Sequence, residues 1–272
     1  MEAKIETSQS NSSLETKFIQ SANTLFHFTE KRKFVEIMLE NRRISPRYVI
    51  EDVEYLKFPL FTKLAIPMNC FCDIKLHTII EHTAFYGEFG IGFKKSWLIE
   101  KGLQPIHYLN ERSSYTQDLT SELQSLLNNP ENIPEENQDY IFKKLFYIKP
   151  IQGSMWDKKK QKYVNKIFHD ENEWRYVPIY LEESGFKPFI RVGGRENIEV
   201  DEYRNTLNTA MFEKEQLSLK FSFEDIRYLF VKDDEERIKL INFILYQLKI
   251  EERQKAQLIS KIQSIEDIKE DY

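Results

Sequence analysis

The chain has 272 residues, of which 41% are hydrophobic, 31% charged and 14% aromatic. This composition supplies enough apolar surface for one sizeable core and excludes a wholly disordered chain. The formal charge of −5 provides no overall attraction to nucleic acid, because such binding usually needs a concentrated basic surface. Nucleic acid stays possible as a partner only through local clusters such as Arg42, Arg43 and Arg47, and the charge does not indicate it.

The apolar runs and the cysteines bear on location and redox state. No run of about eighteen apolar residues occurs, and the N-terminal residues lack the apolar core of a signal peptide. We therefore expect no membrane span, no export and a cytoplasmic protein. Cys70 and Cys72 occupy alternate positions of one apolar run, which rarely allows disulfide geometry, and two thiols alone cannot form a structural zinc site.

The first part of the chain predicts strands that alternate with helices. Residues 1–22 are polar and rich in Ser and Asn, which is typical of a mobile leader, and the main domain is expected over 23–232. The clustered glycines favour a tight turn followed by a closely approached strand. The spacing of apolar residues predicts, in order, a strand at 24–29, a helix carrying Phe34, Ile37 and Met38, a strand ending near Asp73, a helix at 74–86 and a strand after Gly87, Gly90 and Gly92.

The second part predicts a helical insertion and a helical end. Two helical patterns separated by Asn128-Asn129-Pro130 predict an insertion at 113–147. Residues 233–272 repeat apolar side chains at helical spacing, so we expect C-terminal helices there. The class is α+β, with a mixed or antiparallel sheet. The remaining predicted features are strands at 146–150, 172–179, 217–221 and 228–231 and a Lys-rich turn at 157–162.

Two polar triplets on apolar strands are the candidate chemistry. His27-Phe28-Thr29 lies on the first predicted strand and Glu171-Asn172-Glu173 enters a later one. Residues two apart on a strand share a face, so each triplet, with Arg175, can present polar groups to one cleft. The structural alternative is that Glu173 pairs with Arg175 or with a lysine of a neighbouring strand, and that His27 is a hydrogen-bonded core histidine.

Other signatures are weak. The sequence has no phosphate-binding loop with Lys-Ser/Thr, no H-E-x-x-H and no G-x-S-x-G. His82 lies on a helix that leads into the glycine turn. A histidine there can act as an acid or a base, or it can simply be favoured at the helix end by the helix dipole. His82, His169, Asp170 and Glu171 have the types of a mixed nitrogen and oxygen metal site, but their separation gives no reason for them to converge, so we predict no metal.

Four sequence blocks follow one another along the chain: Leu25-Phe26-His27-Phe28-Thr29, Ile66-Pro67-Met68 with Cys70-Phe71-Cys72-Asp73-Ile74, Glu81-His82 with Tyr86-Gly87-Glu88-Phe89-Gly90-Ile91-Gly92-Phe93, and Asp170-Glu171-Asn172-Glu173-Trp174-Arg175-Tyr176-Val177-Pro178. Together, in this order, they resemble the AbiGi family. That resemblance implies a role in abortive infection, in which an infected bacterium shuts itself down, and it implies the antitoxin half of a two-component system with a co-encoded toxin as partner. It supplies no catalytic residue.

The chain is also similar, more weakly, to ADP-ribosyltransferases, including DarT-like toxins. This similarity implies a split, transferase-like sheet and NAD as cofactor. It implies that Glu173, with Glu171, is catalytic and stabilises the positive charge that develops on the ribose. It assigns NAD contacts to His27, Thr29, Tyr86 and Arg175. Tyr86 precedes the glycine strand here, whereas many transferases place the stacking aromatic after it.

Two functions thus remain open within phage defence: an NAD-dependent ADP-ribosyltransferase-like effector and a non-catalytic antitoxin. The first requires His27 and Glu173 to lie within one cleft large enough for a dinucleotide. We predict that the two residues lie on neighbouring strands and face the same concavity. Alternation along the strand further predicts that Trp174 and Tyr176 are buried on the face opposite Glu173 and Arg175.

Overall fold

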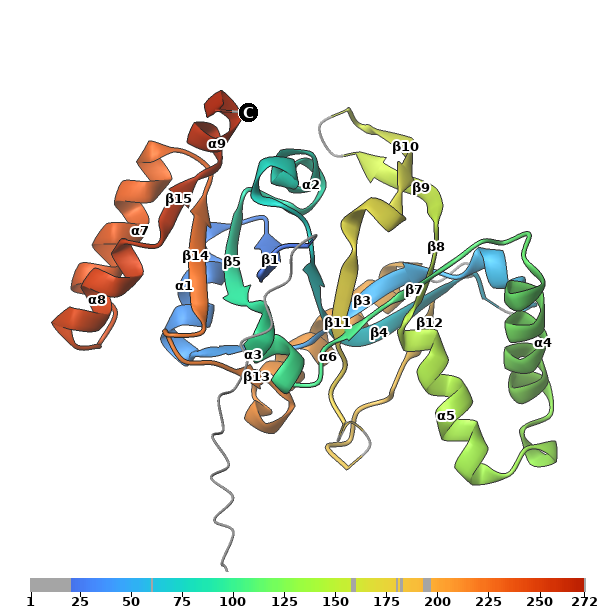
Figure 1. Cartoon of the computed structure of the whole chain (residues 1–272). Coiled ribbons are helices and arrows are strands. Elements are labelled where there is room, and N and C mark those ends of the chain that lie inside the picture. Colours follow the sequence, from blue (N-terminus) through green and yellow to red (C-terminus); the bar gives the residue numbers. More distant parts are fainter. Residues whose placement is uncertain are drawn as a thin grey trace, which may run out of the picture.

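The computed structural model describes residues 21–59, 61–157, 160–179, 181, 183–192 and 197–271. Its main feature is a nine-stranded sheet (Figure 1) with the order β15-β14-β5-β1-β4-β11-β6, to which β3 and β12 are added by pairing with β4. The β14–β15 pair is parallel and the other pairings of this sheet are antiparallel. The expected α+β class and mixed sheet are confirmed. The leader expected at 1–22 lies almost wholly outside the described residues.

The strands of the sheet are mostly short, and β4 is the longest. Three two-stranded sheets flank it in the described part of the chain: β2 (Arg43–Ile44) with β13 (Leu219–Lys220), β7 (His107–Leu109) with β8 (Ile148–Pro150), and β9 (Gln152–Asp157) with β10 (Lys162–Ile167). The strands of the main sheet are β1 (Thr24–Thr29), β3 (Arg47–Asp52), β4 (Lys63–Cys72), β5 (Phe89–Lys94), β6 (Gln104–Pro105), β11 (Glu173–Tyr176), β12 (Ile190–Val192), β14 (Ile226–Val231) and β15 (Ile262–Ser264).

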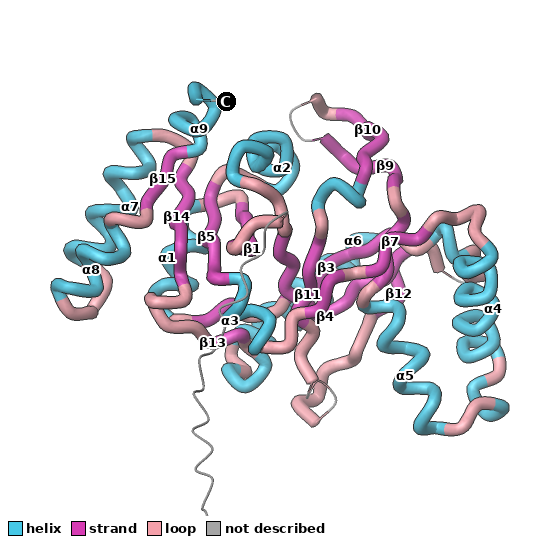
Figure 2. The backbone as a smooth tube through the Cα atoms, in the orientation of Figure 1, coloured by secondary structure: helices cyan, strands magenta, loops and turns pink. Residues whose placement is uncertain are grey.

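Helices cover the sheet on both faces and at both ends (Figure 2). In α1, α4 and α5 the buried apolar residues recur at three- and four-residue spacing, which puts one stripe of each of these helices against the core. The α-helices of the described residues are α1 (Arg32–Asn41), α2 (Ile79–Tyr86), α3 (Lys95–Glu100), α4 (Ser114–Asn128), α5 (Glu135–Phe146), α6 (Asn197–Phe212), α7 (Asp234–Tyr246), α8 (Glu252–Ile259) and α9 (Ile265–Asp271).

Strand β4 belongs to two parts of the sheet. Its last residues pair with β1 and β11, whereas its first residues pair with β3 and β12. The register joins β1 to β4 at one pair of residues, Phe26 and Cys72, so the two strands diverge away from that point. The sheet is therefore split between β1 and β4.

The core of the β1–β5–β14 part lies on both faces of the sheet. Leu25 and Phe26 point to opposite faces because successive side chains of a strand alternate. The Leu25 face packs against α1 and α7, and the Phe26 face packs against α2 and α9. The residues that carry this packing are Leu25, Val35, Ile91, Leu229 and Phe243 on the first face and Phe26, Ile79, Phe230, Ile265 and Ile268 on the second.

The helical insertion covers the other part of the sheet. Leu64, Ile66 and Met68 on one face of β4 share a core cluster with α4 and α5, while Ala65 on the opposite face packs near α6. The two helices expected between 113 and 147 are confirmed. The Ser113 side chain caps α4 by accepting a hydrogen bond from a backbone N–H in its first turn.

The clustered glycines hold β5 against β1. A Cβ at Gly90 would lie 2.6 Å from the carbonyl oxygen of His27. At Gly87, where φ is +108°, it would lie 2.2 Å from the carbonyl oxygen of Thr29. Both distances are too short for a side chain, so the expected close approach is confirmed. It fixes the position of His27.

The C-terminal part differs from the prediction. Residues 233–272 are not helical throughout, because β15 (Ile262–Ser264) lies between α8 and α9 and pairs with β14 at the edge of the sheet. Ile262 and Ile265 are three residues apart, which is a helical spacing. Both are buried, but Ile262 lies on β15 and Ile265 begins α9. A short apolar strand cannot be separated from a helical pattern by periodicity alone.

Other elements were not predicted. The 47–52 region gives mixed signals and forms β3, while α6 and the β9–β10 hairpin have weak apolar periodicity. The Lys-rich turn expected at 157–162 falls between β9 and β10, and residues 158 and 159 lie outside the described ranges.

Candidate functional site

A cavity of about 720 Å³ opens where β1 and β4 diverge. Strand β1 contributes Phe26, His27 and Phe28 to its wall, and β4 contributes residues 68–72. The other walls come from β3, β8, β9 and α2. This volume lies in the range of about 300–1,000 Å³ that small-molecule and cofactor sites occupy. We call it the first cavity.

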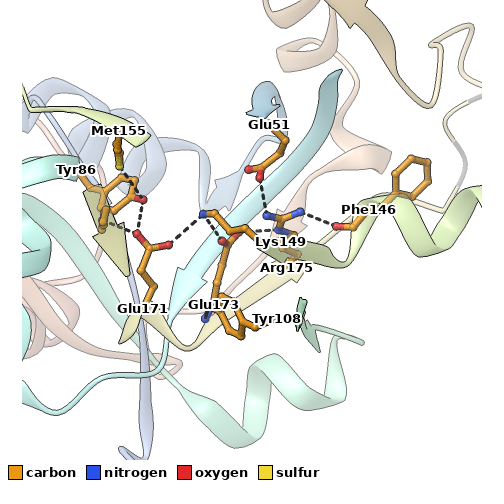
Figure 3. Close-up of polar contacts among 10 residues, drawn as sticks. Glu51, Tyr86, Tyr108, Phe146, Lys149, Met155, Glu171, Glu173 and Arg175 are labelled. Carbon is orange, nitrogen blue, oxygen red and sulfur yellow. Dashed lines mark hydrogen bonds and ion pairs between the residues drawn. The ribbon is translucent and has the colours of Figure 1, made fainter. Parts of the chain in front are cut away.

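The two glutamates of the E-x-E triplet line the first cavity from adjoining elements. Glu171 ends a short 3-10 helix, Phe168–Glu171, and Glu173 begins β11. Between them Asn172 has a left-handed backbone, with φ of 42°, which turns the chain from helix to strand. Both glutamates are buried, at 4% and 5% exposure. Buried carboxylates need partners, and Figure 3 shows them.

Glu173 has two cationic partners. Its Oε2 accepts a hydrogen bond of 2.9 Å from Lys149 Nζ, and its Oε1 accepts one of 2.6 Å from Arg175 Nε. The backbone N–H of Glu173 donates to the Tyr108 hydroxyl at 2.8 Å. The structural alternative, that Glu173 pairs with Arg175 or with a lysine of a neighbouring strand, is therefore confirmed for Arg175, while the lysine partner comes from β8, which does not pair with β11. It does not exclude a chemical role, because the carboxylate also lines the cavity.

Glu171 has three partners. Its Oε1 accepts a hydrogen bond of 2.5 Å from the Tyr86 hydroxyl and lies 2.5 Å from Lys166 Nζ, and its Oε2 accepts one of 3.1 Å from Lys149 Nζ. Lys149 thus bridges the two glutamates (Figure 3). A fixed distance between the two carboxylates follows from this bridge.

Arg175 contacts Glu173 and Glu51 of the network but does not itself line the first cavity. The guanidinium is fully buried, donates to the carbonyl oxygen of Phe146 at 2.8 Å and forms an ion pair of 3.1 Å with Glu51. It thereby ties β11 to β3 and to the end of α5. Its side chain acts on the cavity through Glu173.

The buried network is neutral overall. Three carboxylates face three cations, which are Lys149, Lys166 and Arg175. Burial alone would raise the pKa of Glu173, but the charges of Arg175 and Lys149 outweigh it and hold that pKa well below its usual range. Burial would likewise raise the pKa of Glu171, and Lys149 and Lys166 lower it. Both carboxylates are therefore ionised at neutral pH.

The histidines near the cavity are neutral. Burial lowers the pKa of His82 from 6.5 to about 4, and burial also lowers the pKa of His27. His27 Nδ1 lies 2.8 Å from the carbonyl oxygen of Cys70, so its side chain bridges the split between β1 and β4. The His82 ring stacks on Tyr86 with ring centroids 4.5 Å apart.

The predicted site residues are only partly brought together. His27, Tyr86, Glu171 and Glu173 line the first cavity, whereas the described lining does not include Thr29 or Arg175. The prediction that His27 and Glu173 lie on neighbouring strands is wrong, because β4 lies between them: Cys72 pairs with Phe26 on one side and with Glu173 on the other. Both residues line the first cavity, but the strand registers put their side chains on opposite faces of the sheet: Glu173 pairs with Cys72, which pairs with Phe26, and His27 follows Phe26 along β1.

The side chains of β11 alternate between the two faces of the sheet as expected, but the more buried pair is the charged one and not the aromatic one. Glu173 and Arg175 are buried, while Trp174 and Tyr176 are half-buried and pack against the main core cluster. The expectation of buried aromatics rested on hydrophobicity, and the ion-pair network overrides it here.

The sequence analysis missed the cations of the site. The two cations are Lys149, from β8, and Lys166, from β10. The carboxylate of Glu51, from β3, was missed as well. Of these, Lys149 had a usable signal, because a lysine inside an apolar strand needs a buried partner. The pairing partners themselves are set by tertiary structure.

Other candidate chemistry was also tested. Cys70 and Cys72 are free, and burial raises both thiol pKa values, so the thiols are unreactive at neutral pH. Within the described residues no group of three or more His, Cys, Asp and Glu side chains could hold a metal ion. The described helices also include none that is long and apolar enough to cross a membrane.

The fold and the site define an α+β protein in which a ligand-sized cavity lies over a buried, neutral network of charges. Residues 42–232 match the family model described as "Putative abortive phage resistance protein AbiGi, antitoxin". The chain is 38% identical over 249 residues to the abortive phage resistance protein AbiGi of Lactococcus lactis subsp. cremoris, covering 84% of this chain and 98% of that protein. The chain therefore belongs to the AbiGi family of abortive phage resistance proteins. No solved structure matches it.

Proposed function

We propose that this phage-defence protein is an NAD-dependent ADP-ribosyltransferase-like effector whose substrate NAD occupies the first cavity. The observation that carries the proposal is that His27, Tyr86 and Glu173, to which the transferase similarity assigns NAD contacts, line one cavity of about 720 Å³. They come from β1, α2 and β11, which are far apart in the sequence. Their convergence is a property of the fold.

Glu173 suits the catalytic role better than Glu171 does. A carboxylate has about four lone-pair sites. In the described contacts Glu173 uses two of them, for Lys149 and Arg175, whereas Glu171 uses three. Glu173 therefore keeps more capacity to accept the ribose 2′-hydroxyl. Its negative charge would stabilise the positive charge that develops on the ribose as nicotinamide leaves. Glu171 then acts as a positioning residue that holds Lys149 and Tyr86.

His27 has one nitrogen left for a ligand. The carbonyl of Cys70 can only accept, so His27 Nδ1 carries the proton in this contact. In the neutral ring Nε2 is then an acceptor, which fits a ribose hydroxyl or the amide N–H of NAD. This assignment follows from the hydrogen bond, as tautomers usually must.

Tyr86 supports the wall of the cavity. Its ring stacks on His82, and Lys166 Nζ lies 4.3 Å from the ring centroid. A nicotinamide ring that stacks on Tyr86 would have to take the place of one of these two neighbours. In this proposal the first role of Tyr86 is to orient Glu171 through their hydrogen bond, and stacking on nicotinamide is its second role.

The test is release of nicotinamide from NAD by the full chain, with lysate of infected cells as acceptor. Wild-type protein should turn NAD over, and its expression alone should slow growth. His27→Ala should raise KM more than it lowers kcat, because the His27 contact is made equally in the ground and transition states. No turnover with any acceptor, in protein that is folded, would overturn the proposal.

A second candidate is a non-catalytic antitoxin that covers a co-encoded toxin. The family description names an antitoxin, and the β9–β10 hairpin exposes Trp156 at 42% and Tyr163 at 67%, with their rings 5.2 Å apart. Exposed aromatic pairs of this kind are frequent anchors of protein interfaces. The antitoxin reading predicts that a toxin encoded next to this gene co-purifies with the chain, that Trp156→Ala releases it, and that Glu173→Gln does not.

A further inference from the structure

The hairpin formed by β9 and β10 lies beside α2 (Figure 1), and its two faces differ. The inner face packs on α2, where the Tyr86 hydroxyl lies 3.9 Å from the sulfur of Met155 and Lys166 Nζ lies 4.2 Å from the centroid of the Phe85 ring. The outer face is exposed along its whole length. It consists of three cross-strand pairs, which we call the outer hairpin face: Gln152 with Ile167, Ser154 with Asn165, and Trp156 with Tyr163.

An aromatic pair dominates the outer hairpin face. Trp156 is 42% exposed and Tyr163 is 67% exposed, and their ring centroids lie 5.2 Å apart. At this exposure a large part of each ring is open to solvent. Exposed aromatic rings on strands are surfaces on which unpaired nucleic-acid bases stack, whatever the base, because every base has a π face.

The other polar residues of this face carry no charge. The side chains of Gln152, Ser154 and Asn165 are exposed and have no hydrogen-bond partner among the described residues. Amide groups and hydroxyls both donate and accept hydrogen bonds, so these side chains can pair with the edges of unstacked bases. A duplex keeps its bases stacked inside, and it would use neither the rings nor these groups.

The hairpin also supplies positive charge. Residues 152–167 contain five lysines and one aspartate, although the whole chain has a net charge of −5. The aspartate, Asp157, is buried and lies 3.3 Å from Lys160 Nζ, and Lys166 is paired with Glu171. Lys162 is exposed and has no ion pair among the described residues. Because Lys162 directly precedes Tyr163, its charge is available to a phosphate beside the aromatic pair.

This charge favours a nucleic acid over a protein as the occupant of the face. Aromatic residues are enriched at protein interfaces, but lysines are depleted there. A single strand of nucleic acid makes use of all three features: bases stack on the rings, base edges pair with amides and hydroxyls, and phosphates contact lysine.

We infer that the outer hairpin face binds single-stranded nucleic acid, with bases stacked on Trp156 and Tyr163 and a phosphate bound by Lys162. The family description assigns no ligand to this face. The inference uses neither NAD nor the first cavity, so it stands apart from the proposed transferase function. It gives the aromatic pair a different partner from the toxin of the antitoxin reading.

The experiment measures fluorescence anisotropy of a labelled oligothymidine of about 20 nucleotides with the full chain, at about 50 mM salt, where phosphate contacts are strong. The single strand should bind at least about tenfold more tightly than a duplex of the same length, since only the single strand offers free bases. Tyr163→Ile keeps an apolar residue that favours strands but removes the ring, and it should weaken binding at least about fivefold. Tyr163→Phe keeps the ring and should bind like wild type.

Matched variants control for exposure and charge. Tyr115→Ile removes a tyrosine that is 57% exposed on α4, and it should leave the Kd unchanged. Lys162→Gln should weaken binding and should lower the slope of log K against log salt by about 0.7, which corresponds to one phosphate contact of a single strand. Lys143→Gln removes an exposed lysine of α5 and should change neither quantity. Lys162→Gln also tests the inference should Tyr163→Ile fail to fold.

The inference is overturned if oligothymidine does not bind at this salt concentration, or if the duplex binds as tightly. It is also overturned if either Tyr163→Ile or Lys162→Gln, in folded protein, binds oligothymidine like wild type. A co-encoded toxin that Trp156→Ala releases, together with no binding of oligothymidine, would assign the face to a protein instead. Absence of NAD turnover would leave these outcomes unaffected and would bear only on the proposed function.

Discussion

The two parts of the sheet bury their residues in different ways. Around β1, β5 and β14 the interior is aliphatic and aromatic, with Leu25, Ile91 and Phe230 fully or almost fully buried. Around β8 and β11 the interior contains Lys149, Glu173 and other charged side chains that compensate one another. Apolar burial stabilises without directional constraints, whereas buried charges are tolerated only with well-placed partners. The apolar part supports the fold, and the charged part holds the wall of the first cavity in place.

The largest effect should follow from removing the C-terminal end of the apolar part. A chain that ends at Lys249 lacks α8, β15 and α9, and with them the buried residues Leu258, Ile262, Ile265 and Ile268. Each buried aliphatic residue contributes roughly 2–5 kcal/mol, so the loss is on the order of the whole stability of a domain. Urea unfolding should find no cooperative transition. A cooperative transition near that of the full chain would show that β15 is dispensable.

The next effect concerns the charged part. Arg175→Met leaves Glu51 and Glu173 without their shared buried partner. Breaking a buried pair by removing one member costs about 3–5 kcal/mol. Urea unfolding of this variant measures the loss. A change below about 1 kcal/mol would show that the network is solvated, because exposed pairs contribute no more than that.

This contrast also explains how much the sequence predicts. The strand at 24–29 and the helices at 113–147 follow from apolar periodicity and from loop signals, both of which are local. The E-x-E triplet likewise draws attention to Glu173, because charges on an apolar strand need an explanation. These features depend on residues that are close in the sequence.

The rest depends on tertiary placement. The position of β4 between His27 and Glu173 is a matter of strand order, which no local pattern carries. Lys166 reaches Glu171 from β10, whose apolar signal is weak, and Lys149 reaches both glutamates from β8, a predicted strand whose partners no local pattern specifies. The contacts of Lys166 with the rings of Phe85 and Tyr86 arise only when the β9–β10 hairpin packs beside α2.

A smaller effect should appear in the pH dependence of stability. The folded state depresses the pKa of His82 from 6.5 to about 4, so the neutral ring is favoured on folding. Its contribution is complete above pH 6.5 and is lost as the pH falls from 6.5 to 4, because the unfolded chain binds the proton first. His82→Gln should therefore flatten the free energy of unfolding across this window.

The control for this prediction comes from the apolar part. Ile262→Val removes one buried methylene and should lower the free energy of unfolding by about 0.5–1.5 kcal/mol at every pH. Equal slopes for His82→Gln and wild type between pH 6.5 and 4 would contradict the assignment of His82 as a half-buried neutral histidine.

The smallest effect belongs to the surface. Asp139 and Lys143 on α5 form an ion pair in which both side chains are more than half exposed. Exposed pairs of this kind contribute at most about 0.5 kcal/mol, so Asp139→Asn should leave the unfolding midpoint in urea nearly unchanged. A loss as large as that of Arg175→Met would erase the distinction between buried and exposed charges in this molecule.

The most direct test of the central claim compares the two glutamates as catalysts. Both Glu173→Gln and Glu171→Gln keep the size of the side chain and remove one charge, and the measurement is kcat for nicotinamide release from NAD by folded protein. If Glu173 stabilises the developing ribosyl charge, Glu173→Gln should lower kcat at least about a hundredfold, and Glu171→Gln should lower it less, because Glu171 acts through its contacts with Lys149 and Tyr86. Unchanged turnover in Glu173→Gln, or a larger loss in Glu171→Gln, would contradict the account.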